Sequence, residues 1–247
     1  RNPTTSPSST SSTSSTKSTS SRGRGLIWLC IPKNIDTEDK HEFARQARQE
    51  AELVQKLTSA GIFVGTINQL RVKLEHSRRK PKGPFLGKGP FRWLHFIGHC
   101  GRSTFDNFGL VNENSNGQEE TIDEDAFVRT LTTLCINDKT TDAVEQQLTF
   151  VSLNACLSSS LAQKLVNAGI PSVWGWDTRC DGEAAKVLAV KFFQLWFGEE
   201  RFPVRNAFDM AKSVVETYEA RDSGSRRHKF GRPLTENESI RDPSLKE

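Results

Sequence analysis

The stretch TFVSLNACLSSSLAQKLVNAGIPSVWGWDT, residues 149–178, holds a strand pattern, a junction and a helix pattern in direct succession. An apolar run at 150–153 is followed by Asn154 and a single cysteine, Cys156, after which three serines open a helix pattern that Gly169 ends. A short apolar run bounded by turn residues is typical of a strand buried on both faces. The stretch therefore predicts a strand–turn–helix unit with Cys156 at the turn.

Short apolar runs and amphipathic stretches alternate on both sides of this unit. We expect strands at 25–32, 62–67, 91–99, 148–155 and 170–178, and helices at 36–61, 68–79, 123–135, 158–169, 181–200 and 203–220. Asn116-Gly117 predicts a hairpin within 109–122, and Asp123 is expected to cap the helix that follows it. Strands that alternate with helices indicate the α/β class, with a mostly parallel central sheet and helices on both faces.

Composition divides the 247 residues into three parts. Sixteen of residues 1–21 are Ser or Thr, too polar to offset the entropy of ordering them, so 1–25 is predicted to be a disordered linker. The segment has no apolar core and is not a signal peptide. Because the chain begins with Arg1, we expect a fragment or processed piece of a longer protein. Residues 26–220 form the predicted domain, and 221–247 a polar, flexible tail.

Charge and cysteine usage exclude several functional classes. No apolar run approaches the roughly 18 to 20 residues of a membrane helix, so no membrane partner is expected. Five cysteines at irregular spacing, with no CxxC pair, predict neither a disulfide framework nor a zinc module, and we expect no metal or other cofactor. Reduced thiols indicate a cytoplasmic protein. The basic stretch at 71–92 is interpreted as an exposed loop rather than a nucleic-acid site.

Two predicted strand ends carry reactive side chains. Ligands and chemistry collect at the carboxyl ends of strands in α/β sheets. The third predicted strand ends at His99 and the fourth just before Cys156, and adjacent strands lie about 4.8 Å apart. A histidine can take the proton of a nearby thiol, and the amino end of the helix after Cys156 favours the thiolate. The backbone amides of Cys100 and Cys156 are candidates for an oxyanion hole.

A structural interpretation competes with this one. Free cysteines are among the most buried residues, so Cys156 at a strand end could simply pack against its neighbours. The same holds for a histidine that follows a strand. His95, inside the third strand among apolar residues, is predicted to be packed in the core, and Cys30 and Cys135 are interpreted as structural.

The two segments RWLHFIGHCG (92–101) and VSLNACLSSSLAQKLVNAGIPSVWGW (151–176) together resemble the caspase-like CHAT family, in the clan of caspases, metacaspases and separases. The resemblance covers roughly residues 26–220. It implies a caspase-like α/β fold and a proteolytic dyad in which Cys156 is the nucleophile and His99 its base or imidazolium partner. The sequence departs from the family pattern at Cys100 and Ser159, where a glycine is usual.

The resemblance also implies a substrate pocket. In relatives of this clan, a charged pocket recognises the substrate residue that precedes the cleaved bond. The strand after the nucleophile forms part of this pocket. Here that strand ends in WGWDT, so we expect Asp177, helped by Asp181, to pair with Arg or Lys of the substrate. Trp176 is expected to wall this pocket and Asn154 to line it. The alternative is that Asp177 is only an exposed cap or turn residue.

These observations lead to one predicted function and one alternative. The predicted function is a cysteine endopeptidase that cleaves a protein substrate after a basic residue. It would be the effector domain of a larger protein, controlled by upstream domains of the same chain or by a regulatory partner. The alternative is a catalytically inactive caspase-like module that serves as a protein-binding scaffold.

Overall fold

The structure is a computed structural model that describes residues 24–31, 38–78, 91–102, 108–113, 119–135, 148–177, 182–222 and 243–246. Within the predicted linker, only the last residues belong to this set. Asn116-Gly117, Asp181 and most of the basic stretch at 71–92 lie outside it.

A six-stranded sheet forms the centre of the molecule, in the order β2-β1-β3-β7-β8-β9. The pairs from β2 to β8 are parallel, and β9 is antiparallel to β8 at the edge. The strands are β1 (Arg24–Leu29), β2 (Gly61–Val64), β3 (Phe91–Ile97), β7 (Phe150–Asn154), β8 (Ser172–Trp176) and β9 (Pro243–Lys246).

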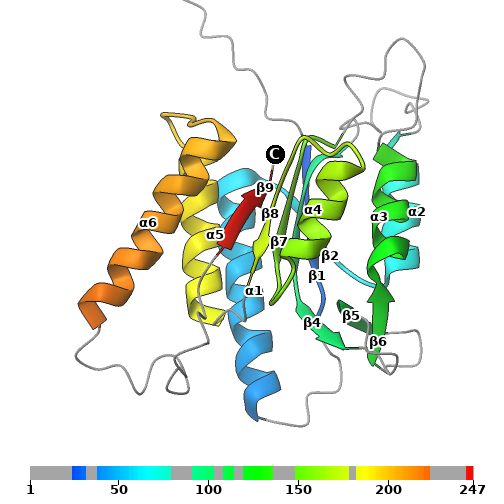
Figure 1. Ribbon diagram of the computed structural model, residues 1–247, viewed down its shortest axis with the longest axis horizontal. Helices are drawn as coiled ribbons and strands as arrows, with labels where there is room; N and C mark the ends of the chain where they lie inside the picture. Colours follow the sequence, from blue (N-terminus) through cyan, green and yellow to red (C-terminus); the bar gives the residue numbers. More distant parts are fainter. Residues whose placement is uncertain are drawn as a thin grey trace, which may run out of the picture.

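Helices cover both faces of this sheet (Figure 1). One face packs against α1, α5 and α6, and the other against α2, α3 and α4. The helices are α1 (Glu38–Thr58), α2 (Ile67–Arg78), α3 (Glu124–Cys135), α4 (Ser159–Asn167), α5 (Gly182–Phe197) and α6 (Val204–Asp222). The predicted fold class, α/β with a mostly parallel central sheet and helices on both faces, is confirmed.

The two central strands alternate their side chains between the two cores, as the pleat of a strand requires. Trp93 and Ile97 of β3 and Phe150 of β7 belong to the core under α1 and α5. Their neighbours Leu94 and Val151 belong to the core on the other face. By the same alternation, positions 95, 152 and 154 face α1, which places three polar side chains within an otherwise apolar layer.

Two predicted helix signals are confirmed. Asp123 accepts a hydrogen bond from the backbone amide of Ala126 at 3.0 Å and so caps α3. Gly169 has a φ of 103°, which glycine adopts without steric cost, and it ends α4.

A second, three-stranded sheet begins at the end of β3. It consists of β4 (His99–Arg102), β5 (Phe108–Glu113) and β6 (Glu119–Asp123), all antiparallel. The β5–β6 pair confirms the predicted hairpin. The predicted strand at 91–99 is corrected: β3 ends at Ile97, Gly98 links the two sheets, and His99 starts a strand of the second sheet.

The predicted tail also contains a strand that the sequence pattern did not indicate. Residues 243–246 form β9 and pair with β8 over the register Val173↔Lys246 to Trp176↔Pro243. The backbone of an edge strand offers unpaired N–H and C=O groups, and an added strand satisfies them. Such pairing depends on the backbone, so it needs no apolar pattern in the added segment.

Candidate active site

The carboxyl ends of β3 and β7 bring two of the predicted residues to the same edge of the sheet. The last paired position of these strands is Ile97 opposite Asn154. One step further, the backbone amide of Gly98 donates a hydrogen bond to the carbonyl of Asn154 at 3.3 Å. His99 and Cys156 each follow two residues after this last pair. Since neighbouring strands are separated by only about 4.8 Å, both residues leave the sheet beside one another.

His99 is half-buried and lies against α1. It is the first residue of β4, where it pairs with Val111 of β5. Its imidazole ring packs on the phenyl ring of Phe43, with the ring centroids 3.7 Å apart and the ring planes at 34°. The backbone of β4 and the ring of Phe43 therefore both restrict the direction in which the imidazole points.

Cys156 lies in a tight turn between β7 and α4 and is half-buried. The next residue, Leu157, has a φ of 54°, the left-handed conformation that side-chain-bearing residues seldom adopt. Strained backbone of this kind costs on the order of 1–3 kcal/mol and persists only where the surroundings enforce it. By contrast Cys30, at the end of β1, is buried, and burial raises the pKa of its thiol above the ordinary value. Cys156 is thus more accessible than Cys30.

Ser158 holds this turn in place from inside the molecule. Its buried hydroxyl donates a hydrogen bond to the carbonyl of Ala155 at 2.7 Å. The same hydroxyl accepts a hydrogen bond from the backbone amide of Trp176 at 3.1 Å. The backbone of Gly175 passes so close that a Cβ there would lie 2.9 Å from the carbonyl oxygen of Ser158. The turn after Cys156 is thus fixed to the neighbouring strand β8.

Helix α4 is fixed to α3 by charged contacts along its exposed side. Lys164 lies 2.9 Å from Glu124 and 3.0 Å from Asp125, and the hydroxyl of Ser160 donates to Glu124 at 2.9 Å. The hydrogen bond to Glu124 is the main reason that the pKa of Lys164 is raised. These contacts hold the amino end of α4 at the turn that carries Cys156.

A buried polar network lies directly beneath this edge, and only some of its members were singled out from the sequence. His95 is fully buried, as predicted, but it is not packed by apolar contacts alone. Its Nε2 lies 2.8 Å from Oε1 of Glu50, and its Nδ1 lies 2.6 Å from the hydroxyl of Ser152. A carboxylate only accepts hydrogen bonds, so Nε2 carries the proton and donates to Glu50. In the neutral ring, Nδ1 then accepts from Ser152.

Asn154 extends this network to β8. Its Nδ2 donates to the same Oε1 of Glu50 at 2.6 Å, and its Oδ1 accepts the indole N–H of Trp176 at 2.8 Å. The indole N–H can only donate, so it fixes which end of the Asn154 amide faces it. All five residues of the network are at most 4% exposed: Glu50, His95, Ser152, Asn154 and Trp176. One carboxylate on α1 therefore joins β3, β7 and β8.

These contacts change the interpretation of two predicted substrate residues. Asn154 and Trp176 were expected to contact the substrate, yet both are buried and their polar atoms bond within the network. Their polar groups bond to other strands and to α1 because β7 and β8 turn these side chains inward. Asp177 follows β8 directly and is exposed. Cys100 lies in β4 opposite Leu110, and Asp181 lies outside the described residues.

Glu50 was missed by the sequence analysis, although the sequence carries a signal for it. The residue comes three positions after Ala47 and four before Val54, both of which are buried on the inner face of α1. A single acidic residue on the apolar stripe of a helix must find a partner when it is buried. Which partner it finds depends on strands about 45 and 100 residues away, as the contacts with His95 and Asn154 show.

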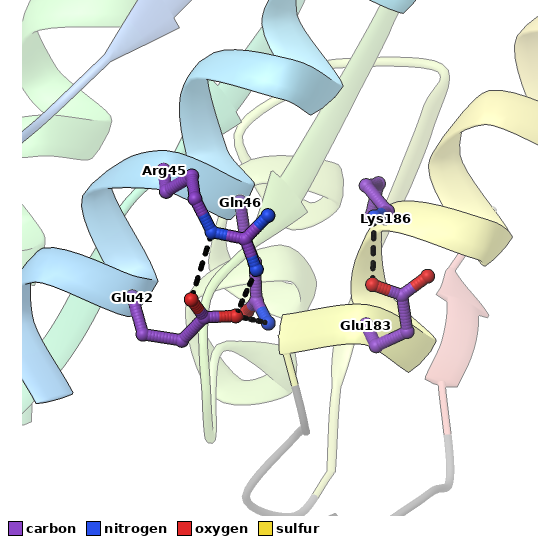
Figure 2. A network of polar contacts seen from close by, with 5 residues as sticks. All are labelled: Glu42, Arg45, Gln46, Glu183 and Lys186. Atoms are coloured by element: carbon purple, nitrogen blue, oxygen red, sulfur yellow. Dashed lines mark hydrogen bonds and ion pairs between the residues drawn. The ribbon is translucent and has the colours of Figure 1, made fainter. Parts of the chain in front are cut away.

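Charged side chains form polar contacts within α1 and within α5 (Figure 2). Glu42 accepts hydrogen bonds from Arg45 and Gln46 of its own helix, while Lys186 and Glu183 pair across a turn of α5 at 2.6 Å. The hydrogen bonds from Arg45 hold the pKa of the exposed Glu42 carboxyl below its ordinary value.

The described residues contain neither a candidate metal site nor a membrane-spanning helix. No group of three or more His, Cys, Asp or Glu residues in this part of the chain is arranged to hold a metal ion. Likewise, none of the described helices combines the length and apolar character that crossing a membrane would need.

The close approach of Gly175 to Ser158 leads to a stability prediction. In Gly175→Ala the added Cβ meets backbone atoms that cannot move without separating β8 from the turn, so we expect the free energy of unfolding to fall by about 1–3 kcal/mol. Urea denaturation measures this value. The matched control is Gly61→Ala in β2, where a Cβ would meet nothing within 4 Å. Equal stability of the two variants would contradict the packing described here.

Comparisons with known proteins found likeness only to solved structures, and the likeness is distant. No model of a known protein family matches the chain, and no curated protein sequence matches it either. Among solved structures, the chain is similar to a secreted C11 cysteine protease from Bacteroides thetaiotaomicron in complex with an irreversible peptide inhibitor. The identity is 10%, the TM-score is 0.46, and the match covers 78% of this chain and 58% of that chain. A likeness this distant assigns no chemistry to the present chain.

Proposed function

We propose that this chain is a cysteine endopeptidase of the caspase-like type in which His99 and Cys156 form the catalytic dyad. One observation supports this most strongly. The register of β3 and β7 ends at Ile97 opposite Asn154, and the two reactive residues follow at equal steps on the same edge of the sheet. The resemblance of both segments to the CHAT family supports the same assignment of roles.

The chemistry needs each of these groups in turn. His99 takes the proton of Cys156, and the thiolate attacks the carbonyl carbon of the scissile peptide bond. The backbone amides of Cys100 and Cys156 donate to the oxyanion that forms. The imidazolium of His99 then protonates the leaving amine, which leaves a thioester on Cys156. Water, activated by His99, hydrolyses the thioester and regenerates the thiol.

One feature favours the thiolate of Cys156, and a second supports a functional role for the turn. The amino end of α4 begins at Ser159, and the partial positive charge of a helix amino end stabilises a nearby anion. The strained backbone at Leu157 sharpens the turn between β7 and α4, and strain of this kind clusters at functional sites.

The proposed substrate is a protein cut after Arg or Lys. Asp177 supports this, because its carboxylate is exposed one residue beyond β8, the strand that follows the turn of Cys156. Asp181 is proposed to assist it. As in the CHAT resemblance, the domain would act as the effector of a larger protein, controlled by upstream domains or by a regulatory partner.

Two departures from the CHAT pattern favour the alternative, an inactive caspase-like scaffold. Cys100 stands where the CHAT family usually has glycine, and so does Ser159. A side chain at position 100 changes the surroundings of the amide proposed for the oxyanion hole. The reactivity of Cys156 decides between the two functions.

The pH dependence of Cys156 alkylation tests the proposed dyad. We expect rapid alkylation by iodoacetamide below pH 7 in the native chain, because a thiolate paired with an imidazolium exists below the ordinary thiol pKa of about 8.5. In His99→Ala the rate should rise only as the pH approaches about 8 to 9. Mass spectrometry reads each site separately, and buried Cys30 serves as an internal unreactive thiol. Slow alkylation at neutral pH in both proteins would favour the scaffold.

Substitution of Asp177 tests the substrate preference. In Asp177→Lys a positive charge replaces the carboxylate, so cleavage after Arg or Lys in a peptide library should fall by about tenfold or more in kcat/KM. The matched control is Asp209→Lys on the exposed side of α6, which should leave the preference unchanged. An unaltered preference in Asp177→Lys would show that another group reads the substrate.

A further inference from the structure

We propose that Glu50 is a positioning residue, which sets the relative placement of the two strand ends that carry His99 and Cys156. This inference rests on the proposed function for its catalytic meaning. Its structural content, that a carboxylate on α1 holds the end of β7 against the end of β3, can be tested separately.

Two hydrogen bonds, one from β3 and one from β7, meet at a single atom of α1. Oε1 of Glu50 accepts from Nδ2 of Asn154 at 2.6 Å and from Nε2 of His95 at 2.8 Å. Glu50 is only 2% exposed, so water does not readily replace these two donors. A buried carboxylate is costly unless its hydrogen bonds are made, which gives this arrangement one favoured geometry.

Asn154 is held on two sides. Its side chain is bonded to Glu50 of α1 and to Trp176 of β8, as described above. Its backbone carbonyl accepts the amide of Gly98, the residue directly before His99. Asn154 is also only two residues before Cys156. A shift of Asn154 therefore moves both members of the proposed dyad.

Helix α1 also contacts His99. Phe43, whose ring packs on His99, lies seven residues before Glu50, which is two helical turns along the same face. The same helix thus contacts the His99 ring directly and the Cys156 strand through Glu50. Through Phe43 and Glu50, α1 therefore contacts the ends of both strands that carry the proposed dyad.

A purely structural role is a poorer account of the network. Several polar side chains fill places on an apolar face where aliphatic residues would pack without any need for partners. Replacing buried polar groups together by apolar ones is often neutral or stabilising, so stability alone does not require them. What a fully bonded network does provide is one defined arrangement of the elements it joins.

An exchange of charge between two positions tests the proposal. Asn154→Asp places a second carboxylate against Glu50 and removes the donor between them. Adding Glu50→Gln supplies a new donor: the glutamine amide at position 50 can donate to the aspartate and to His95 in its other neutral tautomer. The second aspartate oxygen still accepts from Trp176. The double variant is therefore fully bonded, with the donors and acceptors around position 50 reversed.

Amide hydrogen exchange measures the protection of backbone amides at the strand ends, and it does not depend on enzymatic activity. In Asn154→Asp we expect the Gly98 amide to exchange about tenfold faster or more, because its acceptor is displaced. The Thr149 amide bonds to the carbonyl of Arg92 at the opposite end of the same strand pair and should change by less than about twofold. Alkylation of Cys156 near pH 7 should slow in parallel. Both changes should be reversed in the double variant.

The control replaces a neighbouring exposed carboxylate. Glu52 lies on the exposed side of α1, so Asn154→Asp with Glu52→Gln should behave as Asn154→Asp alone. Two results would overturn the proposal. One is equal acceleration at Gly98 and Thr149, which is general loss of stability. The other is a double variant no better than Asn154→Asp, which means that positions 50 and 154 act independently.

Failure of the proposed function would look different. If Cys156 of the native chain alkylates only near pH 8 to 9, the peptidase proposal fails, and exchange at Gly98 still decides whether Glu50 holds the strand end. If Cys156 of the native chain reacts rapidly at neutral pH, the proposed dyad is supported. If the amides of Gly98 and Thr149 then exchange equally faster in Asn154→Asp, the positioning role of Glu50 is overturned.

Discussion

The parallel pairing of β3 with β7 is the interaction on which the site depends. Its register, from Trp93 opposite Phe150 to Ile97 opposite Asn154, decides which residues leave the sheet together. If one strand slipped by one position, all its side chains would move to the other face of the sheet. His99 and Cys156 would then no longer follow the last pair by the same number of residues. The large aromatic side chains in the core under α5 oppose such a slip, because they fill the space between the sheet and that helix.

The buried carboxylate of Glu50 adds directional contacts at the edge where β3 and β7 end. Strands end there, the chain turns sharply after Cys156, and loops begin. Hydrogen bonds from His95 and Asn154 have narrow geometric requirements, whereas apolar contacts are nondirectional. A polar network at this place can therefore define the position of the strand ends to a degree that an aliphatic core would not.

The order and type of most elements could be predicted from the sequence, since buried strands and amphipathic helices have distinct periods. The turn at Cys156 followed from the apolar run before it and the helix after it. Three features could not be predicted this way. Strand β9 forms by backbone pairing with β8, which leaves little trace in side chains. The inward direction of Asn154 and Trp176 follows from the register of two strands. The partners of Glu50 lie far away in the chain and become neighbours only after folding.

The most direct test of the account is whether the side chains of His99 and Cys156 lie within reach of each other in the folded protein. The reagent 1,3-dibromoacetone carries two electrophilic carbons and can bridge a thiol to an imidazole across a short gap. After treatment at neutral pH and digestion, the account predicts a bridged peptide that joins Cys156 to His99 and is absent in His99→Ala. Adducts attached to Cys156 at one end only, or bridged to another residue, would contradict it.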